Sequence, residues 1–191
     1  MQNNIIVNIC NEALAESGQD TTISSLSENS NLAELCNRLW DSTVEEAYSD
    51  YPWAFRTVRC TAALQTVDTV NVYAYPDHCL RILGFYEDKD QLIPEKLARV
   101  GSNIDGETKI YSPRSPLFIE YIRDSGNSDS MPTYVRRGLV ALLASKIATT
   151  KGKDGTKLLE KYMTWLDRGQ EADAREQQID NVSDDRYIDC R

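Results

Sequence analysis

The single histidine, His78, has the most versatile chemistry of any residue in the chain, and it lies between Asp77 and Cys79. A cysteine–histidine nucleophilic pair needs its two side chains to face each other. Adjacent residues on a strand point to opposite faces of the sheet, so we expect Cys79 and His78 to point apart. The sequence contains neither the serine-nucleophile motif G-x-S-x-G nor the phosphate-binding motif G-x-x-x-x-G-K-[ST]. These observations predict neither a nucleophilic centre nor a phosphate loop.

Carboxylates could support a different chemistry, because two of them flanking a glycosidic bond can hydrolyse it. With 30 acidic residues, however, such pairs arise by chance, and a solvated acidic surface explains them as well. One histidine and no C-x-x-C spacing argue against zinc. We predict no catalytic residue, no cofactor and no metal site, and keep a carboxylate-based cell-wall glycan hydrolase as the alternative function. The candidate carboxylates are Glu45, Glu46, Asp105, Glu107 and Glu120.

The five cysteines are odd in number, and three of them lie within apolar periodic runs. This pattern favours free buried thiols in a reducing cytosol over a disulfide framework. The three are Cys10, Cys36 and Cys79; the others are Cys60 and Cys190.

Length and composition are those of an ordinary globular domain. The chain has 191 residues, of which 41% are apolar and 27% charged, so a packed core is expected. A net charge of −9 argues against tight nucleic-acid binding, which needs a basic stripe. No run approaches the roughly 18 apolar residues of a membrane span, and the first residues lack the basic region of a secretory signal.

Basic residues cluster modestly at three places, which are Arg56 with Arg59, Arg136 with Arg137, and residues 151–157. Arginines beside aromatic residues could stack on nucleic-acid bases. More often, such arginines pack their stems and pair with acids. We therefore favour ion pairing within the protein or across a subunit contact.

Helices are expected at both ends of the sequence. Apolar residues at three- and four-residue spacing predict helices over 4–17, 32–49, 132–151 and 155–178, the last with its apolar stripe over the first half only. The second of these ends at the segment YPWAFRTVR, where Pro52 disfavours helical geometry and the rings of Trp53 and Phe55 offer large apolar areas. After Gly169 the last helix becomes almost wholly polar, which predicts that it projects from the core or lies against another chain.

The middle of the sequence instead alternates β-branched and aromatic runs with turn formers. The predicted fold is mainly α, an antiparallel four-helix bundle of N- and C-terminal helix pairs with a small antiparallel β region between them. The expected domains are 1–53 and 124–180 for the helix pairs, 54–123 for the β-rich insertion and 181–191 for an extended tail. The candidate strands are 55–64, 70–75, 80–86, 108–112 and 117–122.

Several segments in order resemble one known family. They are ICNEALAESGQ, ISSL, YPWAFRTVR, YAYPDHCLRI, IYSPRSPLFIEYI and MPTYVRRGLVALLASKIA, with the capped helix 32–49 after the second. Together they resemble the tail tubular protein A family, the head-to-tail adaptors of short-tailed double-stranded-DNA phages, over about residues 3–165. One departure is Tyr75-Pro76-Asp77, where family members often carry a Leu-Pro before the acidic residue.

The resemblance implies a virion protein, made in the host cytoplasm, at the head–tail junction. Its implied partners are the portal protein, the tail nozzle protein and further copies of itself in a ring, expected to be a dodecamer. Phage DNA would pass through without sequence-specific binding, and no membrane is involved. Another non-catalytic neck or tail completion protein remains an alternative. Our predicted interface residues are Trp53, Phe55 and Arg56 after the second helix, and Tyr187 and Ile188 in the tail.

Overall fold

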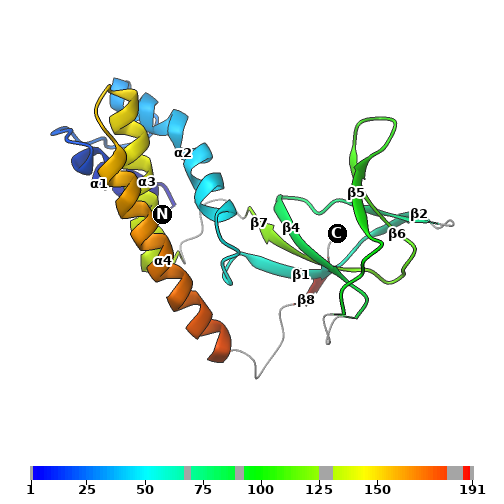
Figure 1. Ribbon diagram of the computed structural model, residues 1–191. Helices are drawn as coiled ribbons and strands as arrows, with labels where there is room; N and C mark the ends of the chain where they lie inside the picture. The colour runs from blue at the N-terminus through cyan, green and yellow to red at the C-terminus, as the bar shows by residue number, and fades with distance from the viewer. Residues whose placement is uncertain (1, 67–69, 89–92, 125–130, 180–186, 190–191) are drawn as a thin grey trace. The chain divides into compact units, whose positions relative to one another are not determined.

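The computed structural model describes residues 2–66, 70–88, 93–124, 131–179 and 187–189 (Figure 1). The chain divides into two compact units. Residues 1–51 and 125–178 form the first, which we call the helical unit, and residues 52–124 and 179–191 form the second, which we call the β unit. The chain therefore passes from one unit to the other three times.

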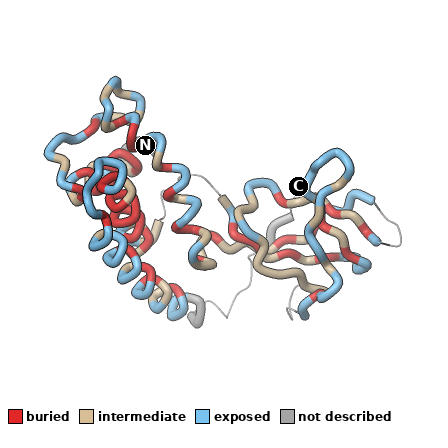
Figure 2. The backbone as a smooth tube through the Cα atoms, turned by 45° about the horizontal axis from the view of Figure 1, so that its top comes forward, coloured by how far each residue is buried: buried red, intermediate tan, exposed pale blue. Residues whose placement is uncertain are grey.

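The helical unit is built around one central helix. Its elements are α1 (Gln2–Glu16), α2 (Asn31–Ser49), α3 (Thr133–Thr150) and α4 (Thr156–Ile179). Every residue of α3 from 138 to 145 is buried, so this helix is covered around its whole circumference and not along one stripe (Figure 2). A helix that is apolar on all sides is stable only when neighbours surround it. Side chains of α1, α2 and α4 supply that cover.

Helix α2 begins one residue earlier than its apolar pattern suggests. Ser30 is the N-cap, and its hydroxyl accepts a hydrogen bond from the Ala33 amide at 3.2 Å. Such a cap satisfies one of the amides that a helix start leaves without a partner. The buried side of α2 includes Trp40 and Thr43, whose hydroxyl donates to the Leu39 carbonyl at 2.7 Å.

Helices α3 and α4 approach closely at the turn that joins them. A Cβ on Gly155 would lie 2.8 Å from the Ser145 carbonyl oxygen, so only glycine fits there without a shift. Farther along, the ring of Tyr162 packs over Gly138. The Tyr162 hydroxyl then donates to the Asp50 carboxylate at 2.6 Å, which ties α4 to the end of α2.

The β unit contains two four-stranded sheets. Sheet A has the order β4-β7-β1-β8 and sheet B the order β2-β3-β6-β5. All neighbouring strands pair antiparallel except β1 and β8, which are parallel. The strands are β1 (Thr57–Thr61), β2 (Leu64–Thr66), β3 (Asn71–Ala74), β4 (Cys79–Tyr86), β5 (Arg99–Ser102), β6 (Thr108–Ser112), β7 (Phe118–Arg123) and β8 (Tyr187–Asp189).

Both sheets contribute to one apolar cluster. Alternate residues of β7 point into it, as period-2 geometry requires, so that Ile119 and Tyr121 are buried there and Glu120 lies on the opposite face. The buried members of the cluster are Cys60, Ala62, Tyr73, Ile110, Leu117, Ile119 and Tyr121.

The prediction of a mainly α fold with a small β region is wrong. The chain is a mixed α/β fold with 44% helix and 23% strand. The middle of the sequence builds more strands than expected, because the predicted strand 55–64 splits into β1 and β2 and because β5 was not anticipated. Since these strands enclose their own core, the β region is a unit in its own right. The predicted tail contains β8, while 180–186 and 190–191 lie outside the described residues.

Candidate functional site

His78 lies in the turn between β3 and β4, and Cys79 is the first residue of β4. His78 has a φ of 54°, a left-handed conformation uncommon for a side-chain-bearing residue, and its carbonyl accepts a hydrogen bond from the Asp124 amide at 2.7 Å. The Cys79 thiol contacts the Tyr75 hydroxyl at 3.4 Å. Burial raises the pKa of Cys79, and burial together with Cys79 raises the pKa of Tyr75 to about 12. An activated cysteine needs the opposite shift, a lowered pKa.

The five candidate carboxylates are divided between the units, and three of them pair with cations. Glu46 of α2 pairs with Lys146 of α3 at 2.7 Å in the helical unit. In the β unit, Glu107 pairs with Lys109 at 2.8 Å and Glu120 with Arg59 at 2.8 Å. These contacts are those of structural ion pairs. Among the described residues, no group of three His, Cys, Asp or Glu side chains could hold a metal ion.

The predicted interface residues after α2 form a turn that leads into β1. The Trp53 carbonyl accepts hydrogen bonds from the Arg56 and Thr57 amides, both at 2.9 Å. Trp53 and Arg56 are buried, and the Arg56 guanidinium lies 5.3 Å from the centre of the half-buried Phe55 ring. The Arg56 carbonyl accepts from the Arg123 amide at 2.9 Å, which fixes the turn to the end of β7. Phe55 is therefore the most accessible of the three.

Tyr187 and Ile188, the other predicted interface residues, belong to β8. Their backbone lies beside β1, with Tyr187 opposite Arg59 and Ile188 opposite Cys60. The structure thus brings the C-terminal segment against the strand that follows the Trp53–Arg56 turn. All five predicted interface residues are in the β unit.

The cysteines depart from expectation at one position. Cys10, Cys36 and Cys79 are free, and the contact between the Cys10 and Cys36 thiols, together with burial, raises the pKa of Cys10. Cys60 is disulfide-bonded, so the expectation that all five cysteines are free thiols is wrong. Long-range strand pairing decides which cysteines meet, and cysteine spacing does not reveal it.

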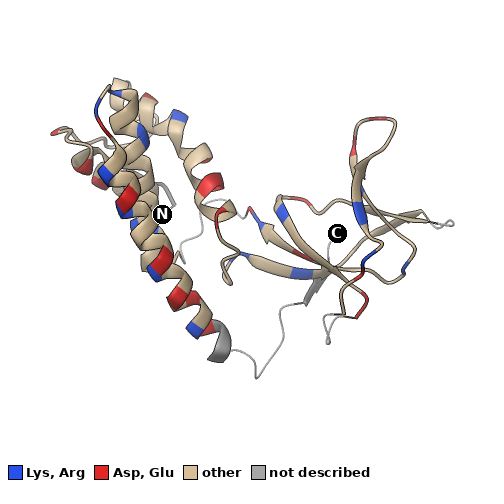
Figure 3. Ribbon diagram, in the orientation of Figure 1, with Lys and Arg blue, Asp and Glu red and all other residues tan. Residues whose placement is uncertain are grey.

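Two of the three basic clusters form ion pairs within their own unit. Figure 3 shows basic and acidic positions interspersed along the helices. Arg136 and Arg137 at the start of α3 both reach Glu12 of α1. The Lys153 amine donates to the carbonyls of Ser17 and Gly18 at 3.1 and 3.0 Å, where a cation complements the C-terminal end of α1. The preference for ion pairing of the arginines beside the aromatic residues is therefore confirmed for Arg59, and Arg136 and Arg137 also pair within their own unit.

An ordered polar row crosses the outward face of sheet A. Two hydrogen bonds connect Arg59 of β1, Glu120 of β7 and Tyr86 of β4. The Glu120 carboxylate accepts from the Arg59 guanidinium at 2.8 Å and from the Tyr86 hydroxyl at 2.9 Å. The Tyr86 ring folds over Gly84, where a Cβ would lie only 2.8 Å from its hydroxyl oxygen. Burial, followed by the bond to Glu120, raises the pKa of Tyr86. The row presents a guanidinium and a phenol in fixed positions, which suits recognition more than catalysis.

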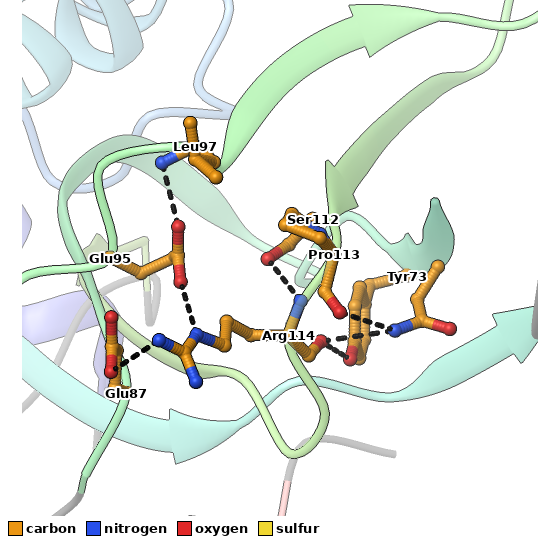
Figure 4. A network of polar contacts seen from close by, with 8 residues as sticks. Tyr73, Glu87, Glu95, Leu97, Ser112, Pro113 and Arg114 are labelled. Atoms are coloured by element: carbon orange, nitrogen blue, oxygen red, sulfur yellow. Dashed lines mark hydrogen bonds and ion pairs between the residues drawn. The ribbon is translucent and has the colours of Figure 1, made fainter. Parts of the chain in front are cut away.

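Arg114 is the centre of a second polar network in the β unit, seen in Figure 4. Its guanidinium pairs with Glu87 at 3.1 Å and with Glu95 at 3.3 Å. The Glu95 side chain is only 2% exposed, and it also accepts a hydrogen bond from the Leu97 amide at 2.6 Å. Two carboxylates converge here on one guanidinium, so the three groups together keep a net charge of −1. The network ties Glu87 and Glu95 to the turn that carries Arg114.

The backbone at Arg114 anchors the same network to sheet B. Its amide donates to the Ser112 hydroxyl at 3.1 Å, and its carbonyl accepts from the Asn71 side chain at 3.2 Å and from the Tyr73 hydroxyl. Sequence reasoning missed these residues. The only indication of the network in the sequence was the charged residue Arg114 within the turn Ser112–Pro116. Its partners, which are distant in the sequence, could not be predicted.

Large apolar side chains are exposed along the segment that this network positions. Leu97 is 71% exposed, Val100 of β5 is exposed, and Ile104 at the tip of the β5–β6 hairpin is fully exposed. Singly exposed apolar residues are common on protein surfaces, but three within residues 97–104 make this segment our candidate contact surface. We call Leu97, Val100 and Ile104 the hairpin apolar residues. The sequence feature that could have indicated this surface is Ile104, a large apolar residue within the turn-forming stretch 103–106.

In the described part of the chain, no helix combines the length and the apolarity that crossing a membrane requires. Comparison with known proteins gives no match to a protein-family model and none to a curated protein.

Proposed function

We propose that this protein is a structural subunit of the head-to-tail junction of a short-tailed phage. In this function it joins the portal to the tail nozzle as one copy in a ring, and DNA passes through the ring. The ordered segments that resemble tail tubular protein A motivate the proposal. The observation that carries it is the division into two self-contained units, because an adaptor must present different surfaces to two different partners.

The two units suit two kinds of contact. The helical unit has a continuous apolar core with ion pairs at its periphery, and we assign it to the portal side. The β unit exposes the hairpin apolar residues and holds them in place with the Arg114 network, and we assign it to the nozzle side. Exposed apolar anchors on a preorganised backbone lose little entropy when they bind.

The overall charge is compatible with a channel for DNA. A chain with a net charge of −9 repels phosphates and limits adhesion while DNA moves past it. Because Arg59, Arg136 and Arg137 are paired with carboxylates, they do not form a free basic stripe. The negative net charge and the pairing of these arginines favour a channel through which DNA passes over a site that binds DNA.

The test is to mix the purified chain with rings of the portal protein encoded in the same genome. Light scattering should show a portal complex whose added mass corresponds to a ring of chains, about twelve if the implied symmetry holds. A chain alone that stays monomeric would not contradict the proposal, since the portal can template the ring. Failure to bind portal rings, combined with clearing of purified peptidoglycan, would replace this proposal with the hydrolase.

A further inference from the structure

One row of side chains crosses the outward face of sheet B. Tyr73 of β3 and Ile110 of β6 point into the apolar cluster, so their chain neighbours Val72 and Tyr111 lie on the opposite face. Arg99 of β5 is the register partner of Tyr111, and its guanidinium lies 5.8 Å from the centre of the Tyr111 ring. We call Val72, Tyr111 and Arg99 the sheet B row. The row combines an aliphatic side chain, an aromatic ring and a cation on three adjacent strands.

The sheet B row is accessible and carries a positive charge. Val72 and Tyr111 are half-buried, and Arg99 is exposed. The Tyr111 ring lies over Gly101, where a Cβ would come within 3.2 Å of it, so the lack of a side chain there lets the ring pack this closely. Within the described residues, no carboxylate pairs with Arg99. Since tyrosine and arginine are enriched among the residues that dominate protein interfaces, the row has the composition of a contact surface.

Helix α4 presents the complementary combination. Leu159 and Met163 are 45% and 49% exposed, and they are the two large apolar side chains exposed in the described part of the helical unit. Glu160 and Asp167 lie three residues before and four residues after Met163, so all four residues share one side of the helix. In the part of the chain that the structure describes, neither carboxylate forms an ion pair. We call these four residues the α4 patch.

We propose that the α4 patch of one copy packs on the sheet B row of a neighbouring copy when the protein assembles. A helix laid against a sheet is a standard way to bury one apolar stripe and one sheet face together. The carboxylates beside Met163 would then lie near the guanidinium of Arg99, so the contact joins opposite charges. The inference rests on the self-association within the proposed function and names the two surfaces that carry it.

The charges and the location of the two surfaces identify a second copy as the occupant. Pairing α4 with α4 would oppose like charges, which is unfavourable, whereas the sheet B row supplies the opposite sign. Every copy carries both surfaces, one in the helical unit and one in the β unit. Each copy therefore donates one surface and receives the other, which is a heterologous contact and can close into a ring.

The test uses two full-length variants with one accessible cysteine each. One carries Val72→Cys in the sheet B row, and the other carries Met163→Cys in the α4 patch. Both also carry Cys79→Ser, which removes the half-buried free thiol, while the free thiols of Cys10 and Cys36 are buried. The two chains are mixed on portal rings and, separately, free in solution at up to about 1 mM, the order of the effective concentration between tethered neighbours. A short bismaleimide should link them into a heterodimer.

Two controls test specificity. Random collision is measured with Arg175→Cys in place of Met163→Cys, because Arg175 is a highly exposed residue of α4 outside the patch. The expected heterodimer yield is several-fold above this control. Adding Asp167→Arg to the Met163→Cys chain should lower the yield several-fold, and adding Arg99→Glu to the Val72→Cys chain should then restore it. Circular dichroism checks that each variant is folded.

A third variant distinguishes contact between copies from contact within one copy. It carries Val72→Cys and Met163→Cys in the same chain and should form no internal link in dilute solution. An internal link would show that the two surfaces meet within one chain, which overturns the proposal.

The portal rings separate failure of this contact from failure of the proposed function. If the chain binds the rings but the heterodimer yield stays at the collision level, the contact is overturned and the adaptor stands. A yield above that level on the rings supports the contact, even when the free chains stay apart. If the chain does not bind portal rings, the adaptor proposal fails, and the yield in free solution decides on the contact: a yield at the collision level overturns it.

Discussion

The two units of this protein differ in how many large apolar side chains they expose. In the helical unit, α3 is buried along residues 138–145, and the ion pairs Glu46–Lys146 and Glu16–Lys161 lie at the periphery. The β unit buries polar groups, including Glu95, and exposes large apolar ones such as Leu97 and Ile104. Both units bury polar groups, such as Asp173 in the helical unit and Glu95 in the β unit, but six of the eight large apolar side chains that are exposed in the described part of the chain lie in the β unit.

This contrast indicates where stability and where recognition reside. Apolar burial is the dominant favourable term in folding, so the helical unit has the composition of a stable scaffold. A buried polar network adds little net stability, but it fixes one backbone conformation. In the β unit the fixed conformation is that of the segment carrying the hairpin apolar residues. The predictions below test this division, beginning with the largest expected effect.

Truncating the core of α3 should have the largest effect. Leu143 is completely buried, so Leu143→Ala should lower the free energy of unfolding by about 2–5 kcal/mol, through lost burial and the cavity left behind. The matched control is Leu97→Ala, the same change at a side chain that is 71% exposed, which should cost less than about 0.5 kcal/mol. Urea unfolding followed by circular dichroism measures both. Equal losses would contradict the division between the units.

Breaking the Arg114 network should have an intermediate effect. Arg114→Met leaves the Glu95 carboxylate buried without its cation, which costs about 3–5 kcal/mol for fully buried pairs. Because the Arg114 side chain is 58% exposed, solvent screens the loss, and we expect about 1–2 kcal/mol. Adding Glu95→Gln should recover part of it. Hydrogen exchange of the β5 and β6 amides would report the change, and strictly additive effects of the two substitutions would contradict the network.

Removing one hydroxyl from the helical unit should have a smaller effect. Tyr162→Phe loses the bond to Asp50 and should cost about 1 kcal/mol near neutral pH. Burial, and then the Asp50 carboxylate, raises the pKa of Tyr162 above its ordinary value of 10.0. The stabilisation is therefore complete below pH 10 and lost as pH rises above it. Thermal unfolding between neutral pH and pH about 11 should show a steeper alkaline loss for the unsubstituted chain; parallel curves would refute the assignment.

The sequence predicted the helices well, because each one carries a long apolar repeat. The expected helix 32–49 is observed as Asn31–Ser49, and the expected helix 155–178 as Thr156–Ile179. Which side of each helix is buried was harder to predict. The second half of α4 looked wholly polar, yet Gly169 and Asp173 continue the buried stripe of Tyr162 and Leu166. A small residue and a buried carboxylate can fill buried positions without any apolar signal.

The strands and polar networks depended on contacts that sequence patterns do not encode. The run Arg99–Ser102 has no apolar alternation and became β5 through its pairing with β6. Strand β8 is paired to a segment more than 120 residues earlier in the sequence. The ion-pair partners of Arg114, Glu87 and Glu95, both lie between β4 and β5 in the sequence. The adaptor assignment and the predicted interface residues remain predictions.

The smallest effect on stability, and the most informative for function, should come from the tip of the β5–β6 hairpin. Ile104 is fully exposed, so Ile104→Ser should change the free energy of unfolding by no more than about 0.5 kcal/mol. If the hairpin contacts the tail nozzle, the same substitution should weaken binding to the nozzle protein by about tenfold or more, as truncating an apolar anchor does. Asp105→Asn, one residue along the same turn, is the control and should leave binding nearly unchanged. Unaltered nozzle binding by Ile104→Ser would remove the hairpin from the interface and leave its exposed apolar residues without a role.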